Sequence, residues 1–237
     1  MKSNHLWLKQ VMKFGLFLMM GVGMSACSAK SWKEEVLLHD GKKIIVERAQ
    51  HLGSRPTMES RERQILSETI TFPLPETNRK ITWEMSFRDD IPEPNGVNVL
   101  VLDIVNNIPY IAGYPAGCIA YNKWNRPNPP QILYKYEGTQ WKRISLKEFP
   151  SQINRANLIV GGPPAEGIKS FYTVAQVNEE NNDISEVAYK TIVREPLKVG
   201  SAGAVGVVTC PDYNSPQYRS FKAPLSMKPL DEKPKNQ

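Results

Sequence analysis

The chain has 237 residues, of which 30 are Lys or Arg and 24 are Asp or Glu, so its formal net charge is +6. Hydrophobic residues make up 41% of the chain and charged residues 23%, which is typical of a folded globular protein and excludes disordered and fibrous chains. The length favours one domain with a substantial core of its own.

The first informative segment is the N-terminus, residues 1–26. It contains three Lys residues and no acidic residue, and it ends in thirteen uncharged, mostly apolar residues, Phe14 to Ala26. This run is too short to span a bilayer, which takes about 20 residues, but a basic segment followed by a short apolar run is typical of a secretory signal. The alternatives are an ordinary cleaved signal peptide without lipid and an uncleaved N-terminal anchor.

The last residues of this segment and the next one, Met24-Ser25-Ala26-Cys27, resemble the lipobox of bacterial lipoproteins. The resemblance implies that residues 1–26 are removed and that Cys27 carries a diacylglyceryl group and an N-terminal acyl chain such as palmitate. Three acyl chains would attach the protein firmly to a lipid bilayer. Ser28 follows the cysteine, and in bacteria with two membranes the lack of Asp there implies the periplasmic face of the outer membrane.

The mature chain, residues 27–237, has only a slight basic excess. Without Lys2, Lys9 and Lys13 it carries 27 basic and 24 acidic residues, a net charge of +3, which argues against nucleic acid as a partner. From residue 222 onwards Pro, Lys and polar residues dominate. The sequence therefore predicts a single β-rich periplasmic domain over residues 27–221 and a flexible tail over residues 222–237.

Three pairs of alternating or β-branched segments predict β-hairpins, because turn-forming residues join the members of each pair. Asp40-Gly41 joins the first pair and is a strong signal, since Gly accepts a positive φ without a Cβ clash. The run Val97–Val105 is almost continuously apolar and predicts a central strand buried on both faces. The hairpin strands are Val36–His39 with Lys43–Glu47, Glu68–Phe72 with Lys80–Met85, and Ile132–Tyr136 with Gln140–Ile144.

Weaker patterns predict further short elements. Strand-like segments are Ile119–Tyr121, Leu158–Val160, Phe171–Val177, Val187–Arg194 and Ala204–Thr209, although the stretch Ile184–Val193 fits a helix face as well as a strand. Short helices are predicted over Pro56–Leu66 and Leu146–Arg155. Many short strands separated by Gly and Pro turns favour a mainly β fold, an antiparallel sandwich or a barrel-like domain with a few short helices.

Two cysteines besides Cys27 are present, Cys118 and Cys210. Outside the cytoplasm a pair of thiols is usually bridged, so we expect a disulfide between them. It would close a loop of about 90 residues and stabilise the fold by roughly 4 kcal/mol or more on the chain-entropy model. The alternative is two separately buried thiols, and a zinc site is disfavoured because the chain has no CxxC pair.

The sequence shows no standard catalytic motif. It contains no GxSxG, HExxH, Walker or SxxK pattern, and only His39 and His51 remain in the mature chain, so we predict no catalytic residue and no cofactor. Two oxygen-rich stretches, Asp89–Asn95 and Asn178–Asp183, do not match the spacing of an EF-hand. No metal site is predicted.

The segment Asn107–Tyr136 is rich in aromatic side chains interleaved with Asn and Arg. Within it, Tyr121, Trp124 and Arg126 form a candidate ligand surface, because exposed aromatic faces beside an Arg can stack on sugars or hold a peptide. The structural alternative is that these rings fill the core and cover strand ends beside the disulfide.

Three stretches, Trp32–Arg48, Ile81–Glu84 and Trp141–Ile144 with Phe149-Pro150, resemble a group of uncharacterised proteobacterial lipoproteins. This resemblance implies location and anchoring only. Together with the lipobox, it favours an outer-membrane lipoprotein with a periplasmic binding or structural role, whose partners are the lipid bilayer and either envelope proteins or peptidoglycan. The alternative functions are cell-wall glycan binding and a cell-wall-active enzyme.

Overall fold

The computed structural model describes residues 29–56, 63–86, 96–164, 166–198, 206–213 and 215–216. The segments predicted as a signal peptide (1–26) and a tail (222–237) lie outside these ranges. The strands are β1 (Ala29–Leu37), β2 (Lys43–Pro56), β3 (Arg63–Pro73), β4 (Lys80–Ser86), β5 (Val97–Val105), β6 (Ile108–Pro115), β7 (Ile132–Tyr136), β8 (Trp141–Ile144) and β9 (Phe171–Tyr172). The helices are α2 (Cys118–Lys123) and α3 (Val174–Glu180), with 3₁₀ turns η1 (Val187–Tyr189) and η2 (Gly206–Thr209).

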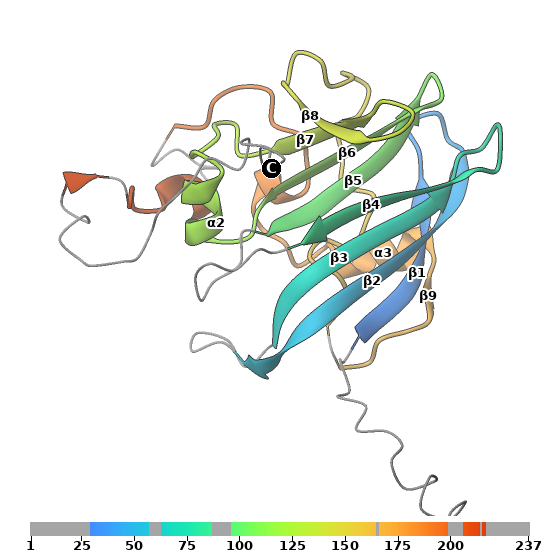
Figure 1. The fold of residues 1–237 in the computed structure, drawn as a ribbon, viewed down its shortest axis with the longest axis horizontal. Coiled ribbons are helices and arrows are strands. Elements are labelled where there is room, and N and C mark those ends of the chain that lie inside the picture. The colour runs from blue at the N-terminus through green and yellow to red at the C-terminus, as the bar shows by residue number, and fades with distance from the viewer. Residues whose placement is uncertain are drawn as a thin grey trace, which may run out of the picture.

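The strands form two sheets that share a common core (Figure 1). One sheet has the order β4-β3-β2-β1-β9 and the other has the order β5-β6-β7-β8. The strand pairings are antiparallel except for that of β1 with β9. The predicted mainly β, antiparallel sandwich is therefore confirmed, and the three predicted hairpins are β1–β2, β3–β4 and β7–β8.

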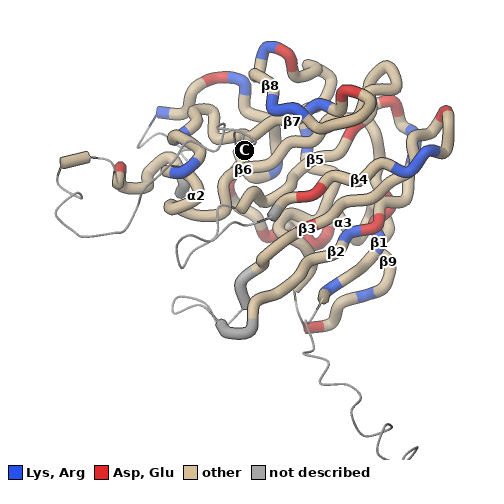
Figure 2. The backbone as a smooth tube through the Cα atoms, in the orientation of Figure 1, with Lys and Arg blue, Asp and Glu red and all other residues tan. Residues whose placement is uncertain are grey.

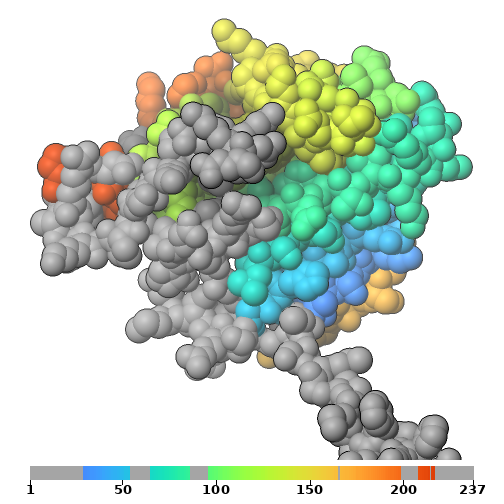
Figure 3. Space-filling model, in the orientation of Figure 1, coloured from blue at the N-terminus to red at the C-terminus, as the bar shows by residue number. Residues whose placement is uncertain are grey.

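The core between the sheets is built from alternate residues of the strands. Val36, Val46 and Ile70 of the five-stranded sheet pack with Val99 and Leu102 of the four-stranded sheet, and all five are fully buried. Period-two alternation puts such residues on one face of a strand, and burial of each contributes about 1.5–3 kcal/mol. The other faces of β2, β3 and β4 lie on the surface of the molecule, where these strands are seen in blue, cyan and teal in Figure 3.

Strand β5 is buried on both faces, as its continuous apolar sequence predicts. Its second face packs against Phe149 and Ile153 in the irregular segment that follows β8. A bulge between Val99 and Val101 shifts the register, and both Leu100 and Val101 lie in this second cluster. The four-stranded sheet is thus covered by the other sheet on one side and by irregular chain on the other.

The connections of the four hairpins gather at one end of the sandwich, which we call the hairpin end (residues 38–42, 74–79, 106–107 and 137–140; Figure 1). Gly41 has a φ of 85°, in agreement with the Asp-Gly signal. Asn106 and Asn107 have φ values of 51° and 61°, which a two-residue turn of type I′ requires and which Asn tolerates better than most residues. Strand β1 runs from Ala29 toward this end, so the first described residue lies at the opposite end.

The segment Phe171–Val177 was predicted as one strand, but only its first two residues form one. Thr173 then begins helix α3, because its side chain accepts a hydrogen bond from the Gln176 backbone while the Gln176 side chain bonds back to the Thr173 backbone. This capping box satisfies free N–H groups at the helix start. Val177 packs against buried Trp32, which ties α3 to β1.

Several of the weaker predictions are wrong. Four segments predicted as strands are found in other conformations. Ile119–Tyr121 lies in α2, Val187–Arg194 contains η1, and residues 206–209 form η2. Leu158–Val160 is irregular. The two predicted helices are also wrong, since Leu146–Arg155 forms turns and irregular chain and the described parts of Pro56–Leu66 belong to β2 and β3. Strand β6 was not predicted. Short apolar runs fit both helix and strand periods, so tertiary contacts decide between them.

Candidate functional site

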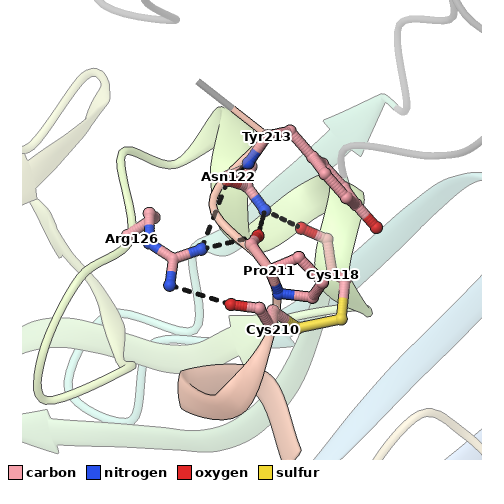
Figure 4. The surroundings of a disulfide bond; sticks show 6 residues. All are labelled: Cys118, Asn122, Arg126, Cys210, Pro211 and Tyr213. Atoms are coloured by element: carbon pink, nitrogen blue, oxygen red, sulfur yellow. Dashed lines mark hydrogen bonds between the residues drawn. A yellow bond between two sulfur atoms is a disulfide. The ribbon is translucent and has the colours of Figure 1, made fainter. Parts of the chain in front are cut away.

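Cys118 and Cys210 form the predicted disulfide (Figure 4). Their Cα atoms lie 5.3 Å apart, and the bond joins α2 to the end of η2, 92 positions later in the chain. Cys210 packs in a small apolar cluster with Tyr121 and Val208. The bridge therefore holds the last described segment against α2.

The three residues of the candidate ligand surface lie beside this disulfide. The side chains of Tyr121 and Trp124 are in the interior, with 3% and 7% of their surface exposed. The guanidinium of Arg126 lies 5.0 Å from the Tyr121 ring centre and donates to the Cys210 carbonyl at 2.9 Å (Figure 4). Burial of both rings favours the structural alternative, and Arg126 fastens the disulfide segment to α2.

Cys27 and the stretch Asp89–Asn95 lie outside the described residues. Asn178–Asp183 forms the last turn of α3 and the turn after it. In the described part of the chain, no group of three or more His, Cys, Asp or Glu side chains is placed to hold a metal ion.

The hairpin end carries three adjoining cavities. The largest, about 590 Å³, lies between hairpin connections and is lined by Leu74, Pro109, Arg79 and Asn107 among others. A second cavity of about 270 Å³ shares Asn107 with the first, and a third of about 250 Å³ shares His39 with the second. We call this row of cavities the end groove. Concave sites of this kind are where proteins usually bind ligands.

Arg79 and Asn107 define the largest cavity of the end groove. The Arg79 Nη2 donates to the Gly138 carbonyl at 2.8 Å and to the Tyr136 hydroxyl at 3.2 Å, which links the β3–β4 and β7–β8 connections. The Asn107 Oδ1 is buried and accepts no hydrogen bond from any described residue. This oxygen has almost no accessible surface, so it does not present an acceptor to a ligand in the cavity.

His39 and Asp103 form a hydrogen-bonded pair between the second and third cavities. The His39 Nδ1 lies 2.7 Å from Asp103 Oδ1, and the His39 backbone N–H donates to Asp103 Oδ2 at 2.9 Å. Asp103 is 3% exposed, whereas the His39 side chain is 22% exposed. A buried carboxylate thus fixes a ring that solvent and ligands can reach.

The pair determines the chemistry that His39 offers. Because the Asp103 carboxylate accepts the proton that Nδ1 carries, the neutral imidazole leaves Nε2 as an acceptor. No described residue donates a hydrogen bond to Nε2. His39 can therefore accept a hydrogen bond from a ligand hydroxyl, and the same atom could take a proton from one.

Sequence reasoning missed this pair, since His39 was only one of two histidines in the mature chain and had no visible partner. The signal that could have found it is Asp103, an acidic residue inside a strand predicted to be buried on both faces. A buried carboxylate needs a partner. The partner could not be named, because 64 positions separate the two residues.

A second polar cluster lies on the inner face of the five-stranded sheet, toward the end where β1 begins. The Arg48 Nη1 donates to Glu34 Oε1 at 2.8 Å, and Arg48 Nε donates to Glu68 Oε1 at 3.0 Å. The side chains of Arg48 and Glu34 have no exposed surface and that of Glu68 has 4%. Burial alone would lower the pKa of Arg48, but the charges of Glu68 and Glu34 outweigh it and raise the pKa.

This cluster also holds the irregular segment after Leu158. Arg48 Nη1 donates to the Ile159 carbonyl at 2.7 Å, and Glu34 Oε2 accepts from the Ile159 N–H at 3.0 Å. Gly162 has a φ of 84°, and a Cβ at that position would lie 2.9 Å from the Gln50 side chain. Because Arg48 and Glu34 bond to both backbone polar groups of Ile159, we interpret the cluster as a structural clamp.

No protein family, curated protein or solved structure matches this chain. The helices of the described chain are also all too short or too polar to cross a membrane. The function must therefore be inferred from the residues and cavities themselves.

Proposed function

We propose that the protein is a lipoprotein anchored to the periplasmic face of the outer membrane, and that its β-sandwich is a binding component of the cell envelope. The observation that carries this proposal is the N-terminal sequence. A basic segment and a thirteen-residue apolar run lead directly to Met24-Ser25-Ala26-Cys27. Together these features are typical of a lipoprotein signal.

The position of the first strand supports an oriented attachment. Cys27 precedes Ala29, the first residue of β1, by two positions. Two residues of extended chain reach at most about 7 Å, so the start of β1 would stay close to the lipid headgroups. The nine residues of β1 then extend roughly 30 Å at about 3.3 Å each, which would direct the hairpin end away from the membrane.

The disulfide supports a compartment outside the cytoplasm. Cys118 and Cys210 are bridged across 92 positions, and such structural bridges are rare in reducing compartments. A disulfide of this kind stabilises the folded state of an exported domain. The end groove supports a binding role, because it is concave and would lie at the end that the anchor leaves free.

Replacement of Cys27 by Ala tests the proposal directly. We expect the parent protein to be found in the membrane fraction and mass spectrometry to detect acyl chains on its Cys27. The variant should lack the acyl chains and should not be cleaved after residue 26. Ser31→Ala, an exposed position on β1 close to the anchor, is the matched control and should leave fractionation unchanged. An unmodified Cys27 thiol behind an intact leader would overturn the proposal.

A further inference from the structure

We propose that the end groove binds an N-acetylated glycan strand of the cell wall, with His39 Nε2 as an acceptor for a sugar hydroxyl. The inference rests on the proposed function for its location only. Its ligand chemistry follows from three properties of the groove: the charge of its lining, the amide side chains around it and its elongated form.

The charge of the lining favours a neutral ligand. Four basic and four acidic side chains line the three cavities, so the groove has no net charge when His39 is neutral. Figure 2 shows both signs next to one another at the hairpin end. These side chains are Lys42, Arg79, Lys135 and Arg155 with Asp40, Glu76, Asp103 and Glu137. A polyanion such as nucleic acid or a strongly acidic peptide would meet no basic surface here.

Amide side chains supply the polar contacts of the groove. Five amide residues line it without any hydrogen bond from their side chains to other described residues: Asn106, Asn107, Gln152, Asn154 and Asn178. An amide donates and accepts at the same time, as do sugar hydroxyls and acetamido groups. Such a set matches a polymer that carries both kinds of group along its length.

The shape favours an extended ligand with some apolar surface. The cavities follow one another from the β7–β8 connection, past Asn107 and His39, to Asn178 of α3. Leu74 and Ile108 provide apolar contact in the largest cavity, where an acetyl methyl group could pack.

The proposed membrane anchor would place the groove near the cell wall. With the anchor at the start of β1, the groove would lie roughly 30 Å from the membrane surface and face the wall. A lipid-anchored protein with a glycan site at this end would connect the membrane to the wall. The His39–Asp103 pair contributes a fixed acceptor to this contact, and Asp103 acts as its positioning residue.

The experiment uses the protein in the form that cells produce, purified in detergent and mixed with isolated cell-wall sacculi. We expect the protein to sediment with the sacculi and to be released by a hexamer of N-acetylglucosamine but not by maltohexaose, which has hydroxyls and no acetamido groups. His39→Ala should weaken retention about tenfold, the loss of one buried hydrogen bond to a ligand. Asn154→Ala and Asn178→Ala, both at exposed positions, should each weaken it several-fold without an effect on folding.

Glu84→Ala, on the exposed outer face of β4, is the control and should bind as the parent does. Failure of the parent to sediment, or equal retention of all variants, would overturn the inference. Equal competition by both hexamers would overturn recognition of the acetamido group. New reducing ends that depend on His39 would replace binding with hydrolysis. None of these outcomes depends on fractionation of the Cys27 variant, so the two proposals fail separately.

Discussion

Replacement of Arg48 by Met should remove much of the stability of the fold. Arg48 bonds to Glu34, Glu68 and the Ile159 carbonyl, and neither carboxylate has more than 4% of its side chain exposed. Loss of one member of a buried ion pair costs about 3–5 kcal/mol, because the remaining charge stays buried without a partner. Here two carboxylates lose the same partner, so we expect a loss of about 5 kcal/mol, a large part of the total of roughly 5–15 kcal/mol.

Urea unfolding of the disulfide-intact protein, followed by tryptophan fluorescence, measures this loss. Trp32 is a suitable reporter, since the Arg48 guanidinium lies 4.9 Å from its ring centre. The matched control is Lys33→Met, which breaks the exposed 3.3 Å pair of Lys33 with Glu47 on the other face of the same strands and should change stability by less than about 0.5 kcal/mol.

A triple variant separates charge from packing. If Arg48, Glu34 and Glu68 are all replaced by Met, no buried charge remains, so the triple variant should be at least about 2 kcal/mol more stable than Arg48→Met alone. A single variant within about 1 kcal/mol of the parent would refute the reasoning. So would a triple variant less stable than the single one.

Three further predictions concern the disulfide, the glycines and a buried phenol. The double variant Cys118→Ala with Cys210→Ala should lose about 4–5 kcal/mol in urea unfolding, whereas unchanged stability would contradict the chain-entropy argument for a 92-residue separation. Gly162→Ala should lower the free energy of unfolding by about 2–3 kcal/mol, because φ is 84° and the new Cβ would lie 2.9 Å from each of two buried side chains. Gly41→Ala has a φ of 85° but open space around it, so it should lower the free energy of unfolding by only about 1 kcal/mol. Equal losses in the two variants would refute the steric contribution at Gly162. Burial raises the pKa of Tyr114 to about 12, so its stabilising contribution is complete below pH 10 and lost as pH rises from 10 to 12. Stability should therefore fall more steeply over that range in the parent than in Tyr114→Phe, and parallel curves would contradict it.

Local signals were sufficient for the elements that depend on neighbours in sequence. Asp40-Gly41 predicted the β1–β2 connection, and the apolar run of Val97–Val105 predicted a strand covered on both faces. They failed for Ile119–Tyr121, which is helical. That run is too short to favour one period, and α2 is held by contacts with Cys210 and the residues around it.

The candidate site was beyond sequence reasoning for a related reason. Tyr121 and Trp124 attracted notice because aromatic residues are conspicuous, but burial decides whether a ring is core or surface. His39 and the amides of the end groove are ordinary residues of turns and loops. They form a site only because connections far apart in the chain meet at one end of the sandwich.

By itself the sequence determined three of the hairpins, the buried strand Val97–Val105 and the class of the fold, since these follow from side-chain alternation and backbone preference over a few residues. It also carries the lipobox, which remains a prediction. Only the tertiary structure decided how the two sheets face each other, and with it the pairing of His39 with Asp103 and of Arg48 with Ile159, which are 64 and 111 positions apart. Such pairs form because packing of the sheets buries Asp103 and Arg48, which then need polar partners, and no local pattern encodes which distant residue will lie beside them.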